Sequence, residues 1–332
     1  MKKIKSLLCI LLCVVSLCIL GGCKKDKGDK EDKKVVTIIQ YVSATALDNA
    51  CEGIKQGLKE AGFVDGENIK LNVYNPQAKA DTLSQYAEKA LEESDIVFAI
   101  ATPVALELVE LSKKLGSEVP IVFTAVTDPV SSGILEDAKN PGGFVTGTTD
   151  LNPVANQIAL AKEIKADASK VGFIYTAGES NSVIQLNLAK EAAANKGLTI
   201  VDRAATNSSD IEQVVTNLIS SGIEFLYIPT DNEIAANMKL VANLCNESGV
   251  VTICGESGML SDGGTITVGS VDYVALGKMT AEMGAKILNG TKPGDLAVQA
   301  WNGDELIVNK TNVEKFNLSV SEEIVNKADK TL

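Results

Sequence analysis

Histidine is absent from this chain of 332 residues, and tryptophan occurs only once. Without histidine the chain lacks the most common general base, the Ser-His-Asp triad and the usual ligand of zinc sites. The sequence also shows no nucleophile placed beside a base and no spacing typical of metal ligands. We therefore expect no enzyme activity, no metal and no cofactor.

Basic residues are fewer than acidic ones: 31 lysine and arginine residues stand against 43 acidic residues, which gives a formal net charge of -12. Such a chain repels the phosphate backbone, so nucleic acid is not an expected partner. Hydrophobic residues make up 45% of the sequence, enough for a sizeable core. After the first twenty residues, no apolar run approaches membrane-spanning length.

The N-terminus has the order of an export signal. Three lysines among the first five residues precede an apolar run from Leu7 to Leu20, which is too short to span a bilayer comfortably. The run ends at Leu20-Gly21-Gly22-Cys23, which resembles the lipobox of bacterial lipoproteins. That resemblance implies a signal peptide over residues 1–22, cleavage before Cys23 and a diacylglycerol on the Cys23 sulfur. The alternative is an uncleaved anchor.

Residues 23–34 contain lysine, aspartate, glutamate and one glycine after Cys23, with no aliphatic side chain. This composition cannot bury enough surface to offset the entropy of ordering, so it predicts a flexible tether. Removing residues 1–22 deletes three lysines and no acid, which takes the net charge from -12 to -15. Two acyl chains hold a protein durably at a bilayer, so the prediction is a lipid-anchored protein outside the cytoplasm.

Three cysteines follow the tether, namely Cys51, Cys245 and Cys254. Their number is odd and their spacing does not suit a metal. A Cys245–Cys254 disulfide is one interpretation for a protein outside the cell. Buried free thiols are the other, because small apolar neighbours surround both residues.

From residue 35 onward, short β-branched runs alternate with helical stretches, beginning with Val35–Gln40 and Ala46–Gly62. The expected elements include a strand at Ile96–Ile100 and a helix over Ile234–Ser248. This alternation predicts a parallel sheet covered by helices, and it restarts at Val171. We therefore expect an α/β fold of two doubly wound parallel-sheet lobes, joined by three crossing segments near residues 147–150, 269–272 and 299–302. The predicted lobe 1 comprises residues 35–147 plus 272–298, and lobe 2 comprises residues 148–271 plus 299–332.

Polar side chains follow nearly every predicted strand in both lobes. Ligands in open parallel sheets meet the carboxyl ends of the strands, so these residues should surround a site between the lobes. Several of them also precede helices, and a role as helix caps is the ordinary alternative for Thr102, Ser182 and Asp231. The functional interpretation depends on the recurrence of such groups at so many strand ends.

The order and spacing of several segments resemble one family, the ABC-transporter substrate-binding proteins that take up tryptophan or tyrosine. The segments are Ala101–Pro103, Val126–Val130, Asn140–Gly147, Glu179–Ser182, Pro229–Asn232 and Val271–Gly277. The resemblance implies a type I periplasmic-binding-protein fold, capture of an aromatic amino acid, delivery to ABC permease subunits, and a monomer. The alternatives are a surface module for sensing or adhesion on the same fold, or another small solute.

An amino-acid zwitterion needs donors for its carboxylate and acceptors for its ammonium group. We predict that Thr102, Thr127 and nearby backbone N–H groups bind the carboxylate, and that Asp231, Glu179 or Asp272 receives the ammonium. The predicted ligand-binding set is Tyr41, Ser43, Leu47, Thr102, Thr127, Asp128, Glu179, Asn181, Ser182, Asp231, Asn232 and Asp272.

Overall fold

The computed structural model describes residues 33–332. Residues 34–332 form one compact unit. The predicted signal peptide, the lipid attachment site at Cys23 and the predicted tether up to residue 32 lie outside the described residues. None of the helices within residues 33–332 has the length and apolar character needed to cross a bilayer.

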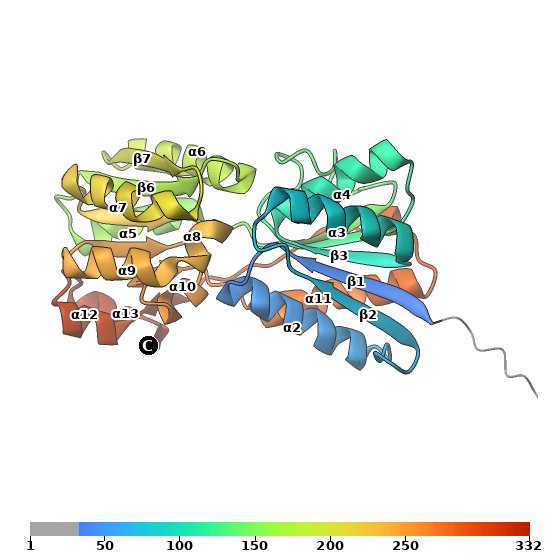
Figure 1. The fold of residues 1–332 in the computed structure, drawn as a ribbon. Coiled ribbons are helices and arrows are strands. Elements are labelled where there is room, and N and C mark those ends of the chain that lie inside the picture. Colours follow the sequence, from blue (N-terminus) through green and yellow to red (C-terminus); the bar gives the residue numbers. More distant parts are fainter. Residues whose placement is uncertain (1–32) are drawn as a thin grey trace, which may run out of the picture. The chain divides into compact units, whose positions relative to one another are not determined.

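The first half of this unit is built on a six-stranded sheet whose paired strands are all parallel (Figure 1). Its buried middle strands consist almost entirely of β-branched and aromatic residues, such as Ile96–Ile100 with every side chain buried. In sheet order the strands are β11 (Gln299–Ala300), β5 (Val145–Thr149), β4 (Ile121–Val126), β3 (Ile96–Ile100), β1 (Lys34–Gln40) and β2 (Ile69–Tyr74). The helices of this half are α2 (Thr45–Glu60), α3 (Ala80–Glu93), α4 (Thr102–Leu115) and α11 (Tyr273–Leu288).

The second half is built on a seven-stranded sheet in which only the β10–β12 pair is antiparallel. In sheet order the strands are β13 (Lys330–Thr331), β12 (Leu306–Val308), β10 (Ile266–Val268), β9 (Val251–Cys254), β8 (Phe225–Ile228), β6 (Lys170–Thr176) and β7 (Thr199–Ala205). The α-helices are α5 (Val154–Ile164), α6 (Ser180–Ala194), α7 (Ile211–Ser220), α8 (Asn232–Ala236), α9 (Met238–Glu247), α10 (Gly258–Ser261), α12 (Lys310–Phe316) and α13 (Glu322–Lys327). Short 3-10 turns occur at Ser208–Asp210 and Pro293–Asp295.

The chain passes between the two sheets three times, after β5, after β10 and after β11, which confirms the predicted architecture of two lobes and three crossings. The crossings pack against one another, because the Trp301 indole Nε1 donates to the Ser270 carbonyl at 3.2 Å. At Gly269, whose φ is +80°, a Cβ would lie 2.3 Å from the ring of Pro153. The residue boundaries predicted for the lobes stay a prediction.

One predicted helix is wrong in detail. The apolar spacing predicts a single helix over residues 234–248, whereas the structure has α8 and α9 separated at Asn237. The Asn237 backbone leaves the helical region at φ -111° and ψ 16°, and its side-chain amide donates to the Glu233 carbonyl at 2.8 Å. Asparagine competes for backbone hydrogen bonds in this way, and a pattern of apolar residues does not report it.

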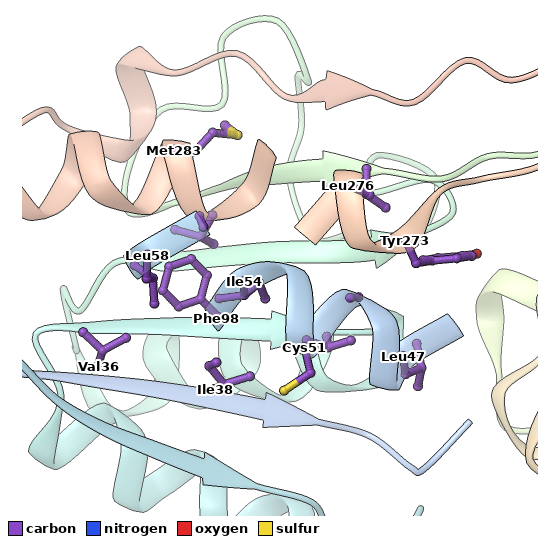
Figure 2. Packing of buried hydrophobic residues seen from close by; sticks show 14 of the residues in the cluster. Val36, Ile38, Leu47, Cys51, Ile54, Leu58, Phe98, Tyr273, Leu276 and Met283 are labelled. Atoms are coloured by element: carbon purple, nitrogen blue, oxygen red, sulfur yellow. The ribbon is translucent and has the colours of Figure 1, made fainter. Parts of the chain in front are cut away.

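One of the two core clusters of the first lobe lies between its sheet and the helix pair α2 and α11 (Figure 2), and the other includes residues of α3 and α4. The two helices approach closely through glycines: a Cβ at Gly277 would lie 2.3 Å from the Ala50 carbonyl oxygen. Leu47 and Tyr273 stand near the N-termini of α2 and α11 at one end of this core, whereas Leu58 lies deeper along α2 (Figure 2). The close helix packing therefore fixes where the N-terminus of α2 lies.

The three described cysteines are free and buried, so the interpretation as free thiols is confirmed and the Cys245–Cys254 disulfide is not formed. Burial raises the pKa of the Cys245 thiol to about 12. A thiol held neutral in this way is not reactive. These residues serve as small core side chains.

Candidate functional site

A cavity lined by residues of both lobes lies between them, at the carboxyl ends of strands from both sheets. Parallel sheets bind ligands at this edge, where loops and helix N-termini converge. The wall comprises Ala44, Ala46, Leu47, Ala125, Thr127, Asp150, Asn181, Thr230, Asp231, Asn232, Ala235, Glu256, Met259 and Tyr273. A more open hollow of about 760 Å³ shares Ala44 and Ala235 with the cavity and adjoins it as a vestibule.

Five of the predicted ligand-binding residues line this cavity: Leu47, Thr127, Asn181, Asp231 and Asn232. Ser43 lines the vestibule. The cavity wall does not include the other six, which are Tyr41, Thr102, Asp128, Glu179, Ser182 and Asp272. The roles of all twelve residues as ligand contacts stay a prediction.

Asp231 is fully buried, and protein donors occupy both of its carboxylate oxygens. Oδ2 accepts from the Thr176 backbone N–H at 2.6 Å and from the Ser182 hydroxyl at 2.7 Å. Oδ1 accepts from the Thr176 hydroxyl at 2.8 Å and from the Ile234 backbone N–H at 2.9 Å. Four bonds fill the usual acceptor capacity of a carboxylate. The capping alternative therefore describes what Asp231 does in this structure.

Glu179 is buried behind the cavity wall and is bonded by the first residues of α8. Its carboxylate accepts from the backbone N–H groups of Asn232 and Glu233 at 3.0–3.1 Å, and from the Asn181 side-chain amide at 3.1 Å. Burial, and then the nearby Asp231 carboxylate, raise the pKa of Glu179. The two acids thus saturate the N-terminus of α8.

The remaining predicted carboxylates have local roles. Asp272 is exposed and caps α11 by accepting from the Ala275 backbone N–H at 3.0 Å. Asp128 accepts from the backbone N–H groups of Val130 and Ser131 in the turn that follows β4. Both positions use short-range hydrogen bonds typical of aspartate at helix starts and turns.

The other predicted residues outside the cavity wall are buried, half-buried or hydrogen-bonded to residues of their own lobe. Thr102 is the buried first residue of α4. The Ser43 hydroxyl is exposed and accepts from the Asn75 side-chain amide at 3.2 Å. Burial, followed by the charge of Glu179, raises the pKa of the half-buried Tyr41 phenol.

Asp150 lines the cavity from the crossing after β5, and sequence reasoning did not select it as a ligand contact. Its Oδ2 accepts from the Tyr273 hydroxyl at 2.7 Å, whereas Oδ1 is buried without a hydrogen-bond partner. Burial raises the pKa of Asp150 to about 6 in spite of the bond from Tyr273. An unpaired buried carboxylate oxygen is costly, and a cationic group would relieve the cost.

Glu256 lines the cavity after β9 and was also missed. Its two oxygens accept from the backbone N–H groups of Gly258 and Met259 at the start of α10, the latter at 2.9 Å. Burial raises the pKa of Glu256 to about 7, and the charges of Asp262 and then Asp150 contribute to the rise. Asp150 and Glu256 therefore lie close enough to repel each other, and no lysine or arginine is in the cavity wall.

Helix α2 begins at the cavity, and no side chain caps its N-terminus. Ala44 stands at the N-cap position and supplies no side-chain acceptor, while Ala46 and Leu47 of the first turn line the wall. Unpaired backbone N–H groups at a helix start attract anions. The acid in that turn, Asp48, accepts from the Gln40 side-chain amide at 2.5 Å and is not in the wall.

Two hydrogen bonds join the lobes across the cavity and its vestibule. The hydroxyl oxygens of Thr127 and Thr230 are 3.3 Å apart, and the Thr45 hydroxyl donates to Asp262 Oδ2 at 3.1 Å. Thr127 and Thr45 belong to the first lobe, and their partners to the second. The structure thus has the site in a closed form.

Comparisons with known proteins agree on one family. The family model of ABC transporter substrate binding proteins matches residues 35–332. A tyrosine-binding protein of Clostridioides difficile (strain R20291) is 32% identical over 328 residues, covering 96% of this chain and 93% of that protein.

Two solved structures of similar proteins differ in their ligand state. An ABC domain in complex with L-Trp from Streptococcus pneumoniae is 28% identical, with a TM-score of 0.83, and covers 90% of this chain and 100% of that one. The ligand-free, open structure of a substrate-binding protein with adhesive properties from Clostridium difficile is 31% identical, with a TM-score of 0.65, over 90% and 99%. The lower score against the open form, at similar identity, agrees with the closed site described above.

Proposed function

Because this chain belongs to the ABC transporter substrate-binding protein family, we propose that it captures tyrosine or tryptophan between its lobes and delivers it to an ABC permease. The family consists of solute-binding proteins, so the role is capture rather than catalysis. Support for the ligand comes from the tyrosine-binding relative at 32% identity and from the L-Trp complex at 28% identity.

The observation that carries this proposal is the unpartnered Asp150 Oδ1 in a closed cavity whose wall contains both apolar and polar residues but no lysine or arginine. A buried carboxylate without a partner calls for a cationic group from the ligand. The ammonium of an amino acid supplies it, and Leu47, Met259 and Tyr273 offer apolar contact for a ring.

We further propose that the mature chain starts at a diacylated Cys23 and works as a monomer on the outer face of the membrane. Substrate-binding proteins of ABC importers act outside the cytoplasm. The ordered signal sequence and the lipobox-like Leu20–Cys23 segment support the anchor. Lysines in residues 24–34 add attraction to anionic headgroups.

A thermal-shift screen of the chain against the twenty amino acids tests the proposal. A ligand present at a hundred times its dissociation constant stabilises the folded state by about 2.7 kcal/mol. We expect tyrosine and tryptophan to raise the melting temperature, and charged or short aliphatic amino acids to leave it unchanged. A screen in which no aromatic amino acid shifts the melting temperature would refute the proposed ligand class.

Adhesion is the second candidate, because a relative at 31% identity has adhesive properties. An adhesive surface would lie on the exterior and would not need the cavity. Adhesion to host cells that persists in Asp150→Asn, after amino-acid binding is lost, would assign it to that exterior.

A further inference from the structure

Two buried oxygens in the cavity wall have no hydrogen-bond partner, and they come from different places in the fold. They are Asp150 Oδ1, after β5, and Asn181 Oδ1, in the first turn of α6. Both side chains are almost fully buried, with 3% and 2% of their surface exposed. Buried acceptors are nearly always satisfied in folded proteins, so each position calls for a donor from a ligand.

The sheet order places Asn181 and Glu256 after strands that are not neighbours. Asp150 lies within electrostatic range of Glu256, which follows β9. Asn181 belongs to the helix after β6, and β8 lies between β6 and β9 in the sheet. Neighbouring strands are about 4.8 Å apart, so Asn181 and Glu256 start from strands about 10 Å apart. An aromatic amino acid extended along this sheet edge would have its ammonium and carboxylate groups at one end of the cavity and its ring at the other.

The end of the cavity at Asp150 and Glu256 suits a primary ammonium group. Asp150 Oδ1 is free, and each Glu256 oxygen accepts a single backbone N–H and so retains acceptor capacity. The start of α2 lies at the same end, since a Cβ on Gly258 would touch both the Glu256 carboxylate and the Thr45 side chain. The free N–H groups of α2 can therefore hold the ligand carboxylate beside the ammonium.

The end of the cavity at Asn181 offers one acceptor, the side-chain amide oxygen, and the hydrogen bonds of the amide nitrogen fix which atom is the oxygen. The Asn181 amide nitrogen donates to the Thr230 carbonyl at 2.9 Å and to Glu179 Oε2 at 3.1 Å. Both of those partners are acceptors, so the nitrogen must face them, and the amide oxygen is the atom left without a partner in this residue of the cavity wall. A phenol O–H or an indole N–H would satisfy that oxygen, whereas a phenyl ring would leave it unpaired.

We propose that the cavity recognises the ligand at two separate points, with Asp150 and Glu256 receiving the ammonium and Asn181 Oδ1 receiving a hydrogen-bond donor on the ring. This inference rests on the proposed function and adds a rule of selectivity to it. Tyrosine and tryptophan are ligands, and phenylalanine is discriminated against although it is the more apolar molecule. A site built around a buried acceptor rejects the analogue that lacks the donor.

Calorimetric titration of the full chain in mild detergent tests the rule with tyrosine, tryptophan, phenylalanine and N-acetyltyrosine. Wild type should bind tyrosine about tenfold to hundredfold more tightly than phenylalanine, and should not bind N-acetyltyrosine measurably. Asn181→Leu should reduce the tyrosine-to-phenylalanine ratio to within about threefold of unity while binding phenylalanine at least as well as wild type. Asp150→Asn should weaken both ligands by about thirtyfold or more and leave their ratio unchanged.

The matched control is Asn195→Leu, the same substitution at the exposed C-terminal end of α6, which should keep the wild-type ratio. Equal affinity of wild type for tyrosine and phenylalanine would overturn the inference without any variant, and so would an unchanged ratio in folded Asn181→Leu. Either result leaves the proposed function standing. Failure of wild type to bind any aromatic amino acid would instead refute the proposed function, and the inference with it.

Discussion

The closed, ligand-free chain should lose stability as the pH rises from about 5 to about 7.5, because Asp150 and Glu256 are buried without a cation. Burial raises the pKa of Asp150 from 3.8 to about 6 and the pKa of Glu256 from 4.5 to about 7. In this window the folded state binds more protons than the unfolded state. The free energy of unfolding must then fall with increasing pH.

The size of the effect follows from the same values. One pH unit over which a group holds an extra proton in the folded state corresponds to about 1.4 kcal/mol. Asp150 holds its proton over about one unit of the window and Glu256 over about two, so together they contribute up to about 4 kcal/mol. Opening of the lobes would hydrate both acids and reduce this amount.

The composition limits which groups can titrate in this pH window. No histidine titrates in this window, since the chain has none. Glu224, whose pKa a lysine partner lowers to about 2, contributes stability that is lost only as the pH falls below about 4.5. Glu179 and Asp231 also have raised pKa values and add to the slope with the same sign. The wild-type slope is therefore a sum over buried acids.

Urea unfolding of wild type and of the double variant Asp150→Asn/Glu256→Gln, at several pH values, isolates the two groups. The variant should show a shallower decline, with its stability relative to wild type improving as the pH rises. Saturating tyrosine should stabilise wild type more at about pH 7.5 than at about pH 5, because its ammonium pairs with the ionised acids. Parallel pH profiles for wild type and the double variant would refute the reasoning.

Three further predictions concern other parts of the chain. Gly277→Ala should lower the free energy of unfolding by about 1–3 kcal/mol, because a Cβ there meets a backbone carbonyl of α2 at 2.3 Å. The control in the same urea assay is Gly178→Ala, where no atom lies within 4 Å of the added Cβ. Asp231→Asn should lower the free energy of unfolding by about 1–3 kcal/mol through lost acceptor bonds, yet weaken ligand binding less than Asp150→Asn does. If calorimetry finds an affinity loss equal to that of Asp150→Asn, the ammonium role belongs to Asp231. Cys23→Ala should abolish metabolic lipid labelling and membrane retention while keeping ligand binding, and a variant still retained on the membrane would show that the N-terminal apolar segment is the anchor.

The sequence predicts the architecture well, because each buried strand is a run of apolar residues with a distinct boundary. Ile96–Ile100 is a strand of both the prediction and the structure, and its five side chains are buried. The rule that ligands meet the carboxyl ends of parallel strands also placed Asn181 and Asp231 correctly in the cavity wall.

The choice among the acids could not be made from the sequence. Asp231 follows its strand as a ligand-binding acid would, but its oxygens are filled by Thr176 and Ser182 from the neighbouring strand and helix. Asp150 keeps one oxygen free, and its other oxygen is bonded by Tyr273, which is more than a hundred residues away along the chain. Which carboxylate remains available is thus decided by tertiary hydrogen bonds that local patterns do not encode.

The most direct measurement of the central claim is a calorimetric titration of the ligand-free chain with tyrosine and tryptophan, beside the cavity-filling variant Ala46→Trp. Ala46 is buried in the first turn of α2 and lines the cavity, so an indole at this position would occupy the space proposed for the ligand ring. The account predicts one site per wild-type chain and no binding by folded Ala46→Trp. Wild-type affinity in the folded variant, or no binding of either amino acid to wild type, would contradict it.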